Sequence, residues 1–122
     1  MRCKGCWSGR SASSRDGGYV TAEAALAVPA LVLLLGMLLW GLGAVTVQLR
    51  CADAARAGAR AAARGEEAAA VAEVAGAAAP GGAAVRIERD GELYRVRVTA
   101  RTLGFGPLAL RVGGEAAAHV ER

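Results

Sequence analysis

The chain has 122 residues, of which 30 are alanine and 17 are glycine, while aromatic side chains make up only 4%. The stabilisation gained on folding scales with buried apolar area, so this composition argues against a compact soluble enzyme. The net charge of +4 is divided between a Gly/Ser-rich N-terminal segment and scattered arginines, which argues against a nucleic-acid binder with a folded basic patch.

Residues 1–18 are rich in glycine, serine and charge and show no hydrophobic period, which predicts a flexible leader. Cys3 and Cys6 have half the spacing of a zinc site, but a structural zinc needs four ligands and the single histidine, His119, is far along the chain. We therefore expect free thiols in the leader and no bound metal. No serine or cysteine has a histidine and an acid beside it in the sequence, and no phosphate-binding loop is present. The expectation is no catalysis, no cofactor and no small-molecule substrate.

The residues from Ala24 to Val47 form a run of 24 without a charge, including eight leucines and four valines. As a helix this run would be about 36 Å long, against a hydrocarbon core of about 30 Å. The sequence therefore predicts a single transmembrane helix within segment 19–49. Pro29 lies inside it and removes one backbone hydrogen bond, which predicts a helix kink.

Segment 50–79 is predicted to continue as an Ala-rich helix, with a break at Gly65 before two acidic residues that would start a second helix. Cys51 begins this segment and allows two interpretations. It forms an intermolecular disulfide on an oxidising face of the membrane, or it is a small interfacial hydrophobic residue just past the apolar run.

Segment 80–122 changes to a period of two residues, which is typical of strands. Asp90-Gly91 predicts a hairpin, and a third strand is expected from Leu108 onward, with a bend or bulge at Gly113-Gly114. A sheet of about three antiparallel strands with one apolar face must be covered, and the Ala-rich helix is the available cover. The predicted fold class is an α+β membrane protein: a long N-terminal transmembrane helix, its Ala-rich extension, and a small antiparallel sheet.

The segment from Gly18 to Pro29, GYVTAEAALAVP, straddles the leader and the apolar run. It resembles the processing and assembly motif of TadE-like minor pilins and pseudopilins of the tight-adherence (Tad/Flp) type IV pilus. In that pattern a basic leader ends in Gly18, Glu23 is the fifth residue after it, and Pro29 is the eleventh. Ala24 stands where many family members have an aromatic residue.

The resemblance implies that a prepilin peptidase cleaves between Gly18 and Tyr19, and that Glu23 pairs with the N-terminal amine of a neighbouring subunit. From the residues alone, Glu23 also fits a simpler role, resting at the lipid headgroups near a helix N-terminus, where an acid is favoured. Four basic residues flank the apolar run on each side, so charge does not orient it. The resemblance implies a cytoplasmic leader and an extracytoplasmic C-terminal part in the plasma membrane.

The expected function is that of a minor pilin in the assembly of an adhesive pilus. The expected partners are the membrane, the prepilin peptidase, the major Flp-type pilin, other minor pilins and the inner-membrane assembly platform, with no nucleic acid. The alternative is a small secreted or membrane-anchored protein with an ordinary signal or anchor sequence and no pilus role. Ala52-Asp53-Ala54 offers an A-x-A cleavage site for that alternative.

Overall fold

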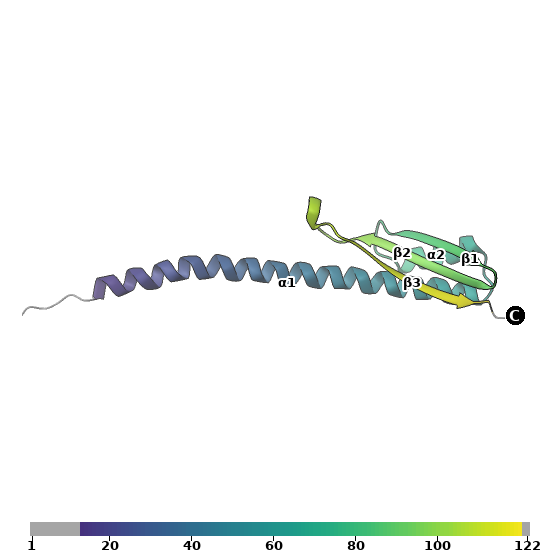
Figure 1. The fold of residues 1–122 in the computed structure, drawn as a ribbon, viewed down its shortest axis with the longest axis horizontal. Helices are drawn as coiled ribbons and strands as arrows, with labels where there is room; N and C mark the ends of the chain where they lie inside the picture. The colour runs from purple at the N-terminus through teal and green to yellow at the C-terminus, as the bar shows by residue number, and fades with distance from the viewer. Residues whose placement is uncertain (1–12, 121–122) are drawn as a thin grey trace, which may run out of the picture. The chain divides into compact units, whose positions relative to one another are not determined.

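The computed structural model describes residues 13–120, with side chains from residue 17, so Cys3 and Cys6 lie outside the described residues. The chain divides into two compact units that meet between Met37 and Leu38. Its helices are α1 (Ser13–Ala63) and α2 (Ala68–Ala78), and its strands are β1 (Ala84–Asp90), β2 (Leu93–Arg101) and β3 (Arg111–His119), all labelled in Figure 1. A short 3-10 helix, η1 (Gly106–Leu108), lies between β2 and β3. The predicted α+β class, with a long apolar helix and a three-stranded sheet, is confirmed.

The first unit contains the N-terminal part of α1, whose side chains from Gly17 to Met37 are all exposed. A window of 18 residues in this helix reaches a mean hydropathy of 2.4. Such a length of exposed apolar surface suits the interior of a bilayer, which supports the predicted span. The helix begins at Ser13 and continues through Pro29, so residues 13–18 of the predicted flexible leader are helical. A helix is extended more easily than it is nucleated, which explains this difference.

The second unit contains the rest of α1, α2 and the sheet. Helix α1 ends at Ala63, Gly65 adopts a positive φ of 82°, and α2 starts at Ala68, so the break predicted at Gly65 is present. A positive φ is costly for residues with a Cβ, which explains why glycine stands at this corner.

The sheet has the order β1-β2-β3, with both neighbouring pairs antiparallel. The register between β2 and β3 runs without interruption from Leu93 opposite His119 to Arg101 opposite Arg111. The bulge predicted at Gly113-Gly114 is therefore wrong. Strand β3 also starts three residues later than predicted.

The later start of β3 has a local cause. Thr102, just after β2, closes the connecting loop by two hydrogen bonds: its N–H donates to the Leu110 carbonyl at 2.8 Å, and its Oγ1 accepts from the Leu110 N–H at 2.9 Å. This closure leaves Leu108 outside the ladder, in η1.

The core lies between the sheet and the two helices of the second unit, and it is built from small side chains. Gly114 shows why: a Cβ added there would lie 2.4 Å from Ala52 Cα, so the β3 backbone touches the α1 backbone. A Cβ on Gly58 would lie 3.0 Å from both Ala75 Cβ and Val96 Cγ1. The Ala-rich helix therefore covers the sheet, as predicted. The buried cluster consists of Cys51, Ala54, Ala55, Ala61, Ala62, Val71, Ala75, Val96, Val98 and Ala100.

Candidate functional site

The predicted processing site, Gly18-Tyr19, lies within helix α1. Both residues are exposed, and a Cβ on Gly17 or Gly18 would meet no other atom within 4 Å. A peptidase that cut at this position would have to unwind the helix to reach the peptide bond. Two adjacent glycines each weaken a helix by about 1 kcal/mol relative to alanine, so the helix is weakened at this position. Processing itself stays a prediction.

Glu23 follows Tyr19 by four residues in the same helix, so the two side chains share one face, one turn apart. Its carboxylate is exposed and makes no ion pair with the part of the chain that the structure describes. The helix therefore presents Glu23 one turn from the residue that would carry a new amine after cleavage. Its pairing with a neighbouring subunit stays a prediction, as does the kink at Pro29.

Cys51 is a free thiol with no exposed surface, in the core between α1 and the sheet. Its carbonyl carbon lies among the backbone atoms that a Cβ on Gly114 would meet, at 2.7 Å. In this position Cys51 acts as a small buried residue in the packing between α1 and the sheet. The intermolecular disulfide stays a prediction, and it would require the helix to separate from the sheet.

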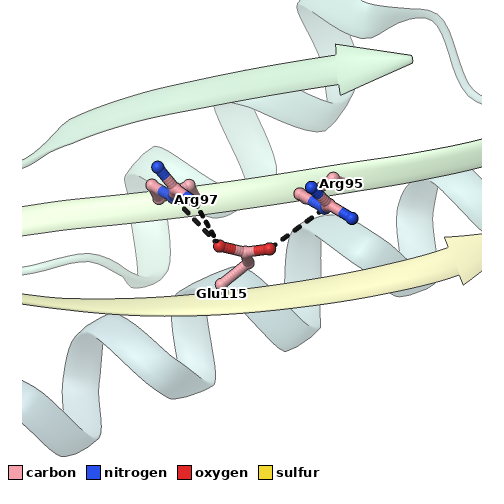
Figure 2. Close-up of polar contacts among 3 residues, drawn as sticks. All are labelled: Arg95, Arg97 and Glu115. Carbon is pink, nitrogen blue, oxygen red and sulfur yellow. Dashed lines mark hydrogen bonds and ion pairs between the residues drawn. The ribbon is translucent and has the colours of Figure 1, made fainter. Parts of the chain in front are cut away.

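The outer face of the sheet carries an ionic cluster that sequence reasoning did not identify. Glu115 of β3 contacts two arginines of β2 (Figure 2): Arg97 Nη2 lies 2.6 Å from Glu115 Oε2, and Arg95 Nε lies 3.0 Å from Oε1. The Arg97 hydrogen bond, aided by the positive charge of both arginines, lowers the pKa of Glu115. The same hydrogen bond raises the pKa of Arg97. The alternation of polar and apolar residues in the sequence predicts that these side chains lie on the polar faces of their strands. Their contact depends on the pairing register between β2 and β3.

Arginines also line a hollow of about 540 Å³ on this outer face. The register sets Arg86 opposite Arg97 and Arg101 opposite Arg111, and like charges directly opposite each other destabilise a sheet. Arg86, Arg101 and Arg111 form no ion pair with the residues described. The hollow is therefore an exposed region of positive charge. Its sequence signal was the arginine content of the polar positions of β2, namely Arg95, Arg97 and Arg101, together with Arg86 on β1.

Metal binding has no candidate site in residues 13–120, where no group of three or more His, Cys, Asp or Glu side chains could hold an ion. His119 is exposed at the end of β3.

Comparison with known proteins gives two matches. Residues 18–60 match the model of the family described as TadE-like protein. The chain is also 50% identical over 80 residues to a protein named "Apoptosis inhibitor Rv3655c" from Mycobacterium tuberculosis, an alignment that covers 66% of this chain and 63% of the relative. No solved structure matches. The family match begins at Gly18 and takes in Tyr19, Glu23 and Pro29, the residues on which the resemblance was recognised. Over residues 18–60, therefore, the chain is similar to the TadE-like family.

Proposed function

We propose that this protein is a minor pilin or pseudopilin that takes part in the assembly of a Tad/Flp-type adhesive pilus. The observation that carries the proposal is the TadE-like match from Gly18 to residue 60, over a long helix whose apolar residues are exposed as far as Leu39. The long apolar helix and the family match indicate single-pass membrane anchoring. The leader is cytoplasmic in this proposal, and the sheet lies on the other side of the membrane.

The exposed helix supports a role in a helical bundle. A charged carboxylate in a membrane helix is costly unless it is paired or reaches the interface. Cleavage after Gly18 creates an α-amino group one helical turn from Glu23, and each group can neutralise its counterpart on an adjacent subunit. The helix then supplies the shared bundle with the major Flp-type pilin and other minor pilins, while the sheet remains available as an outer surface.

Mass spectrometry of the mature chain, expressed with its prepilin peptidase, tests the processing step. The Gly18→Ala variant is expected to remain uncut, whereas the unaltered chain begins at Tyr19. Gly17→Ala is the matched control, because both glycines are exposed, lie in the same helix and have no atom near a new Cβ. Both substitutions strengthen the helix equally. A difference in cleavage between the two variants therefore shows that the peptidase recognises the residue at position 18. Normal trimming of Gly18→Ala would refute the proposed processing.

The role of Glu23 is tested separately by Glu23→Gln, which keeps the side-chain size and removes the charge. We expect this variant to be processed normally but to be lost from sheared pili, as measured by immunoblotting of the pilus and membrane fractions. Normal incorporation would contradict the amine pairing and favour a simple headgroup position for Glu23. An Ala27→Gln control, one turn further along the helix, tests whether an amide in this region disturbs assembly by itself.

The alternative is an ordinary signal sequence cut after Ala54, which would release the C-terminal part. The name of the mycobacterial relative would give such a fragment a candidate role as an apoptosis inhibitor. The packing argues against this cut, because it would remove Cys51 and Ala54 from the core and Ala52 from its contact with Gly114. A mature chain that begins at Ala55 would overturn the pilin proposal and support the alternative.

A further inference from the structure

The loop that joins β2 to β3 presents unburied apolar side chains. Phe105 is 93% exposed and Leu103 is 84% exposed, and Leu108 and Leu110 are exposed as well. Large apolar side chains that gather on one short loop, without packing on their own domain, are typical of a surface that another phase or molecule covers.

The loop has a defined conformation that holds these side chains outward. Its base is closed by the two hydrogen bonds between Thr102 and Leu110. Within it, the Leu108 N–H donates to the Phe105 carbonyl at 3.3 Å, and a Cβ on Gly104 would lie 2.6 Å from the Leu108 carbonyl oxygen. The glycine is needed because the loop backbone folds closely on itself. The exposure of the apolar side chains is therefore a consequence of the folded loop conformation.

One contact joins the loop to the part of α1 that belongs to the second unit. The indole Nε1 of Trp40 donates a hydrogen bond to the Leu103 carbonyl at 3.0 Å, and both residues belong to the second unit. Trp40 lies within the uncharged run, and the uncharged residues before it, 24–39, extend for about 24 Å as a helix, most of a hydrocarbon core of about 30 Å. Tryptophan is enriched at the membrane–water interface, where its ring is in the apolar layer and its N–H finds a partner. We therefore expect Trp40 to lie at the membrane–water interface. The loop lies at the same depth, because Leu103 is hydrogen-bonded to Trp40.

The base of the loop carries charge that suits lipid headgroups. Arg101, at the end of β2, lies opposite Arg111, at the start of β3, and neither forms an ion pair with the described chain. In a bilayer surface, lipid phosphates lie just outside the hydrocarbon. Two guanidinium groups without an ion-pair partner, next to an apolar loop tip, can therefore bind phosphates while the tip contacts the hydrocarbon.

We propose that the loop 103–110 inserts its apolar tip into the bilayer leaflet from which α1 emerges, while Arg101 and Arg111 bind lipid phosphates. The sheet is thereby attached to the membrane at a second point, in addition to the helix. The proposal requires membrane insertion of α1 but neither cleavage after Gly18 nor pilus assembly, so its failure is distinguishable from failure of the proposed function.

Spin labels on the full chain in vesicles test this insertion. In a background with Cys3→Ser, Cys6→Ser and Cys51→Ala, a nitroxide is attached at Phe105→Cys, at Leu108→Cys, or at the control position Ala117→Cys. Ala117 is exposed on the outer face of β3, opposite Arg95. The vesicles contain phosphatidylglycerol and phosphatidylethanolamine at a low protein-to-lipid ratio. Collisions with oxygen, which concentrates in the bilayer, are compared with collisions with a water-soluble nickel chelate.

The oxygen-to-nickel collision ratio is expected to be several-fold higher at 105 and 108 than at 117. Equal ratios at the three positions would overturn the proposal. A label at 105 shielded from both reagents would also overturn it, because the loop would then be covered by protein. The double variant Arg101→Gln, Arg111→Gln is expected to lower the ratio at 105, and an unchanged ratio would refute the phosphate contact.

Discussion

Replacing Gly114 with alanine tests whether the sheet packs on α1 because a side chain is absent at this position. The added Cβ would lie 2.4 Å from Ala52 Cα, 2.5 Å from Ala52 N and 2.7 Å from the Cys51 carbonyl carbon. All three are backbone atoms, so no side-chain rotation relieves the clash, and β3 must move away from the helix. Gly114 has no positive φ, which means that alanine is not otherwise strained here.

The expected size follows from two opposing effects. Forced overpacking in a close-packed core costs about 1–3 kcal/mol, and unyielding backbone neighbours place this site at the upper end. Alanine recovers about 0.5–1 kcal/mol over glycine within a strand. The net destabilisation is therefore about 1–2 kcal/mol, which corresponds to an approximately 5- to 30-fold larger open population of the sheet.

Hydrogen exchange of the β2 amides at Val96 and Val98, measured on the full chain in detergent micelles, reports this population, because buried ladder amides exchange only on opening. Gly76→Ala is the matched control: Gly76 is exposed in α2 and has no atom within 4 Å of a new Cβ. This control is expected to stabilise α2 by up to about 1 kcal/mol. Unchanged or slower exchange of β2 in Gly114→Ala would refute the backbone contact between β3 and α1.

Three further predictions concern the core, the ionic cluster and the loop. Val71→Ala removes two fully buried methyl groups and is expected to cost about 2–3 kcal/mol, measured by denaturant unfolding in micelles; a change below about 0.5 kcal/mol would contradict the burial. Because the folded pKa of Glu115 lies below its unfolded value of about 4.3, its ion pairs stabilise the sheet above that pH and are lost as the pH falls through the folded pKa. Glu115→Gln should reduce this loss of stability in acid, measured by hydrogen exchange of the β2 amides as a function of pH. An unaltered pH profile would contradict stabilisation of the sheet by the Glu115–Arg97 ion pair. Trp40→Phe removes the donor to Leu103, so amides of the loop should exchange about 2- to 10-fold faster while those of the core remain unchanged; equal rates in the loop would show that the bond does not hold it.

Local patterns were enough to predict the main elements. The uncharged run predicts the spanning helix, since crossing a bilayer depends on length and apolarity within one continuous segment. Alternation of Val85 and Ile87 with charged residues predicts β1, and Asp90-Gly91 predicts the hairpin, where Gly91 indeed adopts a positive φ of 63°. The Gly18–Pro29 motif predicted the TadE-like family without any knowledge of the fold.

The packing of the second unit depends on contacts between residues that are distant in the sequence. A periodic pattern within one segment does not predict such contacts. The sequence predicts a bend or bulge at Gly113-Gly114, because a glycine pair in a strand interior is typical of one. The structure instead uses Gly114 for the close approach of α1, a contact that becomes visible only when the two backbones lie side by side. Burial of Cys51 follows from the same approach.

The ionic cluster and the position of the loop 103–110 also depend on contacts between residues that are distant in the sequence. Glu115 meets Arg95 and Arg97 because the register aligns them, and a shift of one residue would turn Glu115 to the other face. Trp40 reaches Leu103 across 63 residues of sequence. The sequence by itself determined which segments form a span, helices and strands, because periodicity and turn chemistry act over a few residues. Tertiary structure alone decided which side chains meet, because small residues allow several close packings and only the assembled core selects one.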